Sequence, residues 1–219
     1  MRLVIIGLMM LFVVSCQQTP NKIVTMQEDV AVLAADEMGG RQTGTPGELL
    51  AAAYITERFS DIGLTPKGSE GNFTQTFSFT PSANPHEQSE FTNIQEDGSV
   101  TGTNVIGYIN NNAATTVIIG AHYDHLGMGG EGSLDREQPA IHNGADDNAS
   151  GIAILLALAD KLKNQSPTIT QNNYLFMAFS GEEMGLLGSN YFVKNPTIDI
   201  KKVNYIKNIC ISALYRIHN

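Results

Sequence analysis

Three short clusters in this chain combine residue types and spacing that could hold a metal ion and move protons. They are, in chain order, His122 with Asp124, Asp146 with Asp147, and Glu182 with Glu183. Imidazole and carboxylate groups without any thiolate are typical of catalytic rather than structural zinc sites. Because zinc in such a setting activates water, the clusters predict hydrolytic chemistry.

Each cluster also has an ordinary structural explanation. An isolated His-x-Asp is usually surface polarity, an Asp pair before a helix usually caps it, and a Glu pair usually lies on a solvated face. What favours one shared site is the joint placement of all three clusters in glycine-rich connecting segments.

Two of the clusters directly follow apolar runs that predict strands. Residues 115–121 precede His122, and residues 174–179 lead into the Glu pair. Ligands bind at the carboxyl ends of strands in open α/β sheets. The Asp pair lies in the loop before a helix whose apolar spacing resumes at Ile152. These placements predict that the three clusters converge.

The other elements follow from periodicity and from helix start and stop signals. Thr45-Pro-Gly-Glu48 predicts a helix start, with Thr45 as N-cap and Glu48 reaching back to it, and Gly63 predicts the end. Further helices are expected at 27–38 and 187–194, and further strands at 72–80, 104–110 and from 203. Strands alternating with helices indicate a three-layer α/β domain with a largely buried sheet.

Three motifs closely resemble the secreted zinc aminopeptidases of the leucyl aminopeptidase and aminopeptidase S type. They are GAHYDH at 120–125, GADDNASG at 144–151 and FSGEEMGLLGS at 179–189. Residues 36–64 resemble the amino-terminal part of bacterial members. The whole likeness covers residues 27–208. It implies a Zn-exopeptidase (phosphorylase/hydrolase-like) fold with a mixed, mostly parallel sheet, two zinc ions and peptide substrates.

The resemblance also implies a role for each motif residue. His122 matches a ligand of one zinc, and Asp124 matches the carboxylate that orients it. Asp146 matches the carboxylate that bridges both metals, with a cis bond to Asp147. Glu183 matches a ligand of the second zinc, and Glu182 matches the general base.

The remaining histidines have no ligand role in the resemblance. His125 and His142 neighbour the motifs but are expected to pack beside the ligands rather than to bind metal. His86 lies in a polar stretch and is expected to be solvated.

The likeness breaks near Ile209. The family continues into a strand of the form Tyr-x-x-Asn-x-Asp-Met-Ile/Val-Gly, whose Asp is a zinc ligand, and a later His is another. Here Cys210 stands where that Asp is expected, and His218 is too near the strand to match the His. A frameshift or premature end, a diverged short protein with Cys210 as a thiolate ligand, and a gene-model fragment are the open explanations. The chain is expected to bind fewer than two zinc ions and to hydrolyse aminoacyl substrates poorly.

Three functions therefore stay open. The leading one is a zinc-dependent exopeptidase that removes amino-terminal residues. This chain is expected to be an incomplete form of it that is weakly active or inactive. The second is a glutaminyl-cyclase-like transferase with a single zinc; the Asp-Asp-Asn loop favours the two-metal hydrolase over it. The third is a non-catalytic lipoprotein with a binding role.

The first residues predict an export signal. Arg2 precedes an apolar run at 3–14, which is shorter than the roughly 20 residues that a membrane-spanning helix needs. The following Ser15-Cys16 completes a pattern similar to a bacterial lipobox, and a plain secretory signal with an incidental Cys is the alternative. We therefore expect a signal peptide at 1–16, a tether at 17–26, the peptidase domain at 27–208 and an aberrant tail at 209–219. Cys16 would carry a lipid anchor on the periplasmic side of a membrane. The outer membrane is favoured over the inner one.

Charge and cysteine content exclude other classes. The formal net charge is −9, and the 13 Lys and Arg form no basic stripe, so no nucleic-acid partner is expected. With Cys16 lipidated, Cys210 has no partner for an internal disulfide.

Overall fold

The computed structural model describes residues 24–82, 89–92, 98–130, 133, 139–164 and 171–209 of the 219-residue chain. Cys16, His86, Cys210 and His218 lie outside the described residues. The expectations for the leader at 1–16 and for the tail beyond residue 209 also fall outside them.

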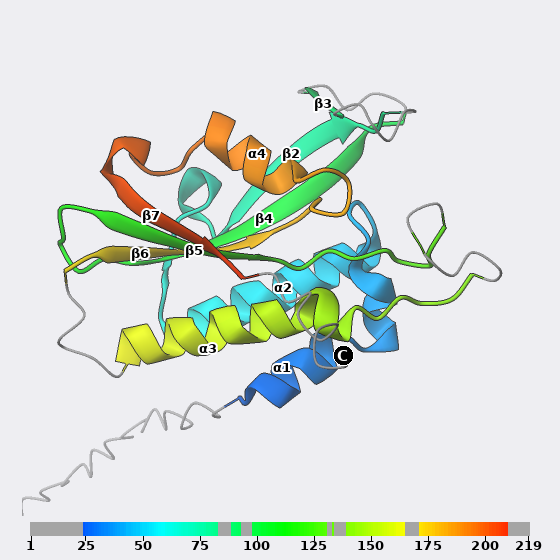
Figure 1. Ribbon diagram of the computed structural model, residues 1–219, viewed down its shortest axis with the longest axis horizontal. Helices are drawn as coiled ribbons and strands as arrows, with labels where there is room; N and C mark the ends of the chain where they lie inside the picture. Colours follow the sequence, from blue (N-terminus) through cyan, green and yellow to red (C-terminus); the bar gives the residue numbers. More distant parts are fainter. Residues whose placement is uncertain are drawn as a thin grey trace, which may run out of the picture.

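One mixed sheet forms the middle layer of the molecule (Figure 1). Its seven strands lie in the order β3-β2-β4-β6-β5-β7, and the short β1 pairs with β4. The strands are β1 (Thr65–Pro66), β2 (Thr74–Thr80), β3 (Glu90–Thr92), β4 (Val100–Ile109), β5 (Thr116–His122), β6 (Asn173–Phe179) and β7 (Val203–Asn208). Nearly every residue of β5 and β6 is buried, as expected for strands inside a sheet covered on both faces.

The expectation of a mostly parallel sheet was wrong for the described strands. Only the pairs β5–β6 and β5–β7 are parallel, whereas β1–β4, β2–β3, β2–β4 and β4–β6 are antiparallel. Parallel neighbours need a long crossover, usually a helix. Helices connect β5 to β6 and β6 to β7, and no helix separates β2, β3 and β4 in the described residues.

Helices cover both faces of the sheet, which confirms the three-layer α/β architecture. α1 (Met26–Leu33), α2 (Pro46–Ile62) and α3 (Ser150–Asn164) lie on one face, and α4 (Leu187–Lys194) lies on the other (Figure 1). Short 3-10 turns at Asp36–Arg41, Ser69–Gly71 and Ile200–Lys202 and a π-helical turn at Ala145–Ala149 complete the described elements. No helix within the described ranges is long and apolar enough to cross a bilayer.

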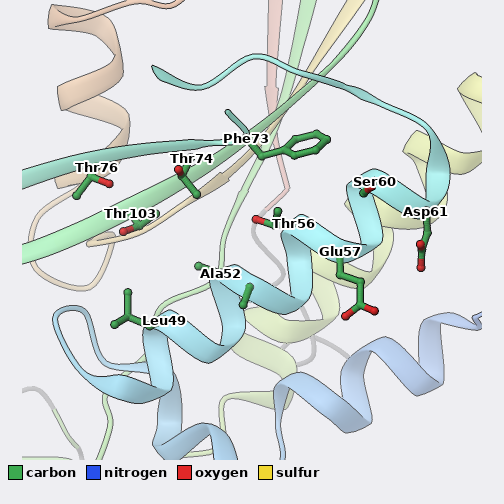
Figure 2. Close-up of a pocket in the computed structure, with 11 residues that line it drawn as sticks. Leu49, Ala52, Thr56, Glu57, Ser60, Asp61, Phe73, Thr74, Thr76 and Thr103 are labelled. Atoms are coloured by element: carbon green, nitrogen blue, oxygen red, sulfur yellow. The ribbon is translucent and has the colours of Figure 1, made fainter. Parts of the chain in front are cut away.

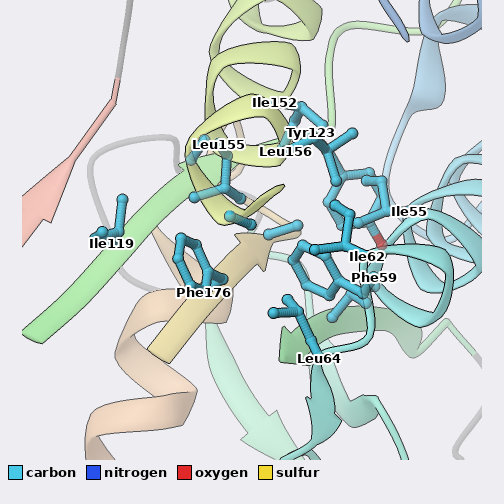
Figure 3. Close-up of a cluster of buried hydrophobic side chains, with 14 of the residues drawn as sticks. Ile55, Phe59, Ile62, Leu64, Ile119, Tyr123, Ile152, Leu155, Leu156 and Phe176 are labelled. Carbon is cyan, nitrogen blue, oxygen red and sulfur yellow. The ribbon is translucent and has the colours of Figure 1, made fainter. Parts of the chain in front are cut away.

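The main core lies between the sheet and the three helices on one face. Figure 3 shows Ile55 and Phe59 of α2 and Ile152 of α3 packed toward Phe176 of β6. Each of these four side chains is fully buried, and burial of one such side chain stabilises the fold by about 1.5–3 kcal/mol. This packing fixes α2 and α3 against the strands that carry the clusters.

The first helix is shorter than the expected range of 27–38. Thr25 and Glu28 form a capping box that starts α1, and the helix ends at Leu33. Gly39 and Gly40 have φ values of 54° and 69° in the turn that follows. The break itself comes earlier, at Ala35, whose extended backbone (φ −71°, ψ 152°) cannot continue a helix.

The second helix begins and ends as predicted, but its capping differs. Thr45 is the N-cap, and Gly63 ends the helix at a φ of 82°. Glu48 does not reach back to Thr45; its side chain is fully buried and turns toward the sheet. A Glu at this position suits the capping box only when no buried donors compete for its carboxylate.

Candidate metal centre

The ends of β5 and β6 bring two of the predicted clusters together. The strands are parallel neighbours, with His122 opposite Phe179. The segments that begin at Tyr123 and Ser180 therefore leave the sheet at one edge. His122 is only 2% exposed and Asp124 only 1% exposed, so both point into the protein rather than into solvent.

Asp124 holds the loop that carries the Glu pair. Its Oδ1 accepts a hydrogen bond from the backbone N–H of Glu182 at 3.1 Å, and its Oδ2 accepts one from Glu183 at 3.2 Å. Nδ1 of His122 lies 3.8 Å from Oδ1, too far for a hydrogen bond, and 3.3 Å from the main-chain oxygen of Asp124. Burial raises the pKa of Asp124 to about 6, against the opposing effects of His122 and the two N–H donors.

In the second cluster, Asp147 rather than Asp146 faces His122. Oδ1 of Asp147 lies 3.1 Å from Nε2 of His122. This oxygen is buried and accepts no hydrogen bond from the described residues. Asp146 is exposed, and the cis bond lies between Asp147 and Asn148, not between the two aspartates as expected.

Asp147 rather than Asp146 faces His122 because the next residue, Asn148, is anchored. Its side chain is fully buried, and its Nδ2 donates to the main-chain oxygens of His122 at 3.2 Å and Ile209 at 3.0 Å. This anchor holds the loop against the end of β5. The residue directly before it, Asp147, is therefore turned so that its Oδ1 is buried against His122, while its side chain as a whole stays 47% exposed and Asp146 is exposed.

His125 joins the site, although the resemblance gave it no ligand role. Its Nδ1 lies 2.9 Å from Oε1 of Glu183. Potential ligand atoms of His125, Asp147 and Glu183 all lie within 4.8 Å of one another. The hydrogen bond to His125 lowers the pKa of Glu183 below its ordinary value, although burial acts in the opposite direction. The sequence signal was the position of His125 in the same motif as His122, three residues further along.

His142 lies beside this group, as expected. Its Nε2 is 3.1 Å from the hydroxyl of Ser133, and its ring centroid is 6.4 Å from that of His125. It is not part of the metal-binding group found among the described residues.

Glu182 has the environment of a proton acceptor. Its side chain is half-buried, and burial raises the pKa of Glu182 above its ordinary value. The charges of Glu183 and Asp147 also raise it, whereas His122 lowers it. A carboxylate with a raised pKa next to a candidate metal group suits the role of general base.

Arg41 is a supporting residue that was not singled out from the sequence. Its side chain is fully buried and, among the described residues, donates to the main-chain oxygens of Tyr123 at 2.7 Å, Asn143 at 2.7 Å and Gly144 at 2.9 Å. Burial lowers the pKa of Arg41 to about 10, and the charges of Asp124 and Asp147 oppose this change. Arg41 thus joins the segment after β5 to the loop that leads to Asp147.

The arrangement fits a divalent cation. The donors are imidazole nitrogens and carboxylate oxygens, which suit zinc. The buried Oδ1 of Asp147 accepts no hydrogen bond from the part of the chain that the structure describes, and a cation would satisfy it. A separate groove of about 660 Å³ between α2 and β2, which Leu49, Thr56 and Phe73 help to line, contains none of these ligand candidates (Figure 2).

Comparison with known proteins agrees with this geometry. Residues 104–209 match the family model described as Peptidase family M28. This part of the chain is therefore similar to peptidase family M28. The family match covers the ends of β5 and β6 and the Asp146-Asp147 loop, and it implies zinc as the metal.

Two curated relatives extend the comparison. The alkaline phosphatase isozyme conversion protein of Escherichia coli is 34% identical over 176 residues, which cover 80% of this chain and 47% of that protein. Leucine aminopeptidase 1 of Arthroderma gypseum is 38% identical over 109 residues, which cover 48% of this chain and 27% of that protein. The chain thus spans about half the length of the first relative and less of the second.

Solved structures show that the fold is that of Zn-dependent exopeptidases. A Zn-dependent exopeptidase from Parabacteroides distasonis has a TM-score of 0.64 at 18% identity, covering 85% of this chain and 60% of that one. The glutaminyl cyclase of Porphyromonas gingivalis has a TM-score of 0.60 at 18% identity, covering 85% and 58%.

Proposed function

We propose that this chain is a zinc-dependent metallo-exopeptidase that removes amino-terminal residues from peptides. The observation that carries the proposal is the position of Asp147, whose buried Oδ1 faces His122 while its carboxylate also belongs to the group with His125 and Glu183. The M28 match and the aminopeptidase relative support the choice of reaction.

His122, Asp147 and Glu183 would hold the metal. The carboxylate of Asp147 lies near both His122 and the His125–Glu183 pair, so it would be within reach of more than one ion. We therefore propose that His122, Asp147 and Glu183 would together hold two zinc ions.

The protein's own residues would then handle the proton. Bound zinc polarises the peptide carbonyl and lowers the pKa of a water molecule. Glu182 would accept a proton from the water that attacks the peptide carbonyl and deliver it to the amine that leaves when the C–N bond breaks. Asp124 keeps Glu182 in place through the backbone N–H bonds to Glu182 and Glu183.

The direct test is hydrolysis of leucine p-nitroanilide by the purified chain loaded with zinc. We expect release of p-nitroaniline that a chelator abolishes, and no release from the N-acetylated substrate, which lacks a free amino terminus. The rate is expected to be low, because Cys210 stands where the resemblance expects an aspartate ligand. Bound zinc without any chelator-sensitive hydrolysis would contradict the exopeptidase proposal and favour a binding role.

A glutaminyl-cyclase-like activity is the second candidate, because a glutaminyl cyclase shares the fold. Such an enzyme would close an amino-terminal glutamine into a ring and release ammonia. A carboxylate placed between two ligand groups favours the two-metal hydrolase. Ammonia release from a glutaminyl peptide, with no cleavage of leucine p-nitroanilide, would reverse this preference.

We also propose a lipid anchor on Cys16, on the sequence pattern alone. The mature protein would then begin at Cys16 and lie on the periplasmic side of a membrane. Mass spectrometry of the amino-terminal peptide tests this directly, and a free thiol on Cys16 in the mature protein would contradict it.

A further inference from the structure

A fully buried carboxylate lies behind the Glu182-Glu183 loop, on a helix that carries none of the proposed ligands. Glu48 belongs to the first turn of α2 and is 0% exposed. It lies outside residues 104–209, which the family model matches. A buried charge lowers stability unless several donors compensate it, so its partners indicate what it is retained for.

Those partners come from four segments, three of them far away from α2 in the chain. Oε1 of Glu48 accepts hydrogen bonds from the hydroxyl of Ser180 at 2.6 Å, the hydroxyl of Tyr123 at 3.0 Å and the backbone N–H of Thr103 at 2.9 Å. Oε2 accepts one from the N–H of Gly44 at 3.0 Å. One carboxylate therefore joins the start of α2 to β4, to the segment after β5 and to the segment after β6.

Thr43 adds a second link to the same loop. Its hydroxyl accepts a hydrogen bond from the N–H of Gly181 at 3.0 Å and lies 3.2 Å from the hydroxyl of Ser180. The same hydroxyl lies 3.4 Å from Oδ2 of Asp124. Thr43 is 4% exposed, so solvent does not provide substitutes for these bonds.

Together these contacts hold four consecutive residues. Glu48 holds Ser180, Thr43 holds Gly181, and Asp124 holds Glu182 and Glu183 through their N–H groups. Gly181 has a φ of 70°, which a free loop would readily leave. The backbone that presents the proposed base and the proposed ligand is thus fixed at every residue.

We infer that Glu48 and Thr43 are positioning residues that fix the Glu182-Glu183 loop for metal binding and proton transfer. This inference rests on the proposed function for the role of the metal. Groups behind a metal ligand that set its orientation typically change metal affinity by about 10–100-fold when removed. A purely structural role would instead lower stability without changing that affinity.

The first part of the test measures the loop without any metal. Thr43→Val keeps the volume and removes the hydroxyl, Thr43→Ser restores it, and Glu48→Gln keeps the shape of the carboxylate. The matched control is Asp29→Asn, which removes another buried carboxylate (1% exposed) bonded to Arg58 and Tyr54. We expect amide hydrogen exchange at residues 181–183 of the full chain to accelerate at least about tenfold in Thr43→Val and Glu48→Gln, but not in Thr43→Ser or Asp29→Asn. Unchanged exchange at 181–183 in Thr43→Val would overturn the inference.

The second part measures Co²⁺ binding by its visible absorption. We expect about 10–100-fold weaker binding in Thr43→Val and Glu48→Gln, and wild-type binding in Thr43→Ser and Asp29→Asn. Equal Co²⁺ affinity in wild type and Thr43→Val would overturn the link between the loop and the metal. If the wild-type chain bound no Co²⁺, the proposed metal function would fail, and hydrogen exchange alone would decide whether Glu48 and Thr43 fix the loop.

Discussion

Adjacent aspartates in this chain have opposite environments. Asp147 presents a buried oxygen to His122, whereas Asp146 is exposed. Residue types alone identified the cluster, because imidazole and carboxylate groups in glycine-rich loops are typical of zinc sites. They could not identify which aspartate turns inward, because the anchoring of the next residue, Asn148, decides that.

The two aspartates give the first prediction. Asp147→Asn should weaken zinc binding by at least about 100-fold, because it removes a ligand charge from the centre of the group. Asp146→Asn is the matched control and should leave the affinity within about twofold, as expected of an exposed side chain. Competition with a chromogenic chelator measures both variants. Loss of binding in Asp146→Asn alone would show that the sequence-based ligand was correct.

Glu182 is the proposed base and lies next to the proposed ligand Glu183. Glu182→Gln should retain zinc, because the side chain is proposed as base rather than ligand. It should lower kcat for leucine p-nitroanilide by about 100-fold or more, because the glutamine amide cannot accept the proton. Zinc analysis and steady-state kinetics on the same preparation check both parts. Unchanged turnover would refute the assignment of the base.

At the scale of elements, helices and strands place the clusters where they can meet. Signals with a local cause were predictable: the start of α2 at Thr45-Pro46, its end at Gly63, and α4 at Leu187–Lys194. The early end of α1 was not predicted, because Ala34 and Ala35 carry no local stop signal, and Asn143, far away in the chain, donates to the main-chain oxygen of Ala34 at 2.8 Å. The direction of Glu48 was missed for a similar reason, since its partners lie in segments far away in the chain.

The start of α3 gives a prediction about packing. A methyl group on Gly151 would collide with the side-chain amide of Asn148, the anchor of the Asp147 loop. Gly151→Ala should therefore lower stability by about 1–3 kcal/mol and also weaken zinc binding. Gly107→Ala is the matched control, because a methyl group there would press on Leu64 in the core, remote from the ligands. Urea unfolding should show that both variants are less stable than the wild type. Zinc titration should show weaker binding in Gly151→Ala only. Equal zinc affinity of Gly151→Ala and the wild type would contradict the role of Asn148.

At the scale of the whole molecule, the sheet has an exposed margin at β7. Within the described residues β7 pairs only with β5, and Tyr205 and Ile206 are 59% and 62% exposed. An edge strand that is paired on one side only and carries exposed apolar side chains promotes association with other chains. The mixed character of the sheet was predictable from the sequence, whereas the excess of antiparallel pairs was not, because strand order depends on the whole chain.

The exposed margin leads to a prediction about solubility. Ile206→Lys should raise the protein concentration at which light scattering first detects aggregates, because a charge on an edge strand opposes pairing between sheets. Zinc affinity should not change, since Ile206 belongs to none of the ligand groups. Lys207→Ala is a useful comparison, because it removes a charge from the same strand and should favour aggregation. Equal aggregation of all three proteins would show that the β7 edge does not drive association.

The central claim is that His122, Asp147 and Glu183 hold zinc, and anomalous diffraction at the zinc absorption edge tests it most directly. In crystals of the zinc-loaded chain, we predict anomalous density at about 2.0–2.2 Å from an imidazole nitrogen of His122 and a carboxylate oxygen of Asp147, with Glu183 coordinating in the same group. Zinc bound by Asp146 instead, or no anomalous density among these three side chains, would contradict the account.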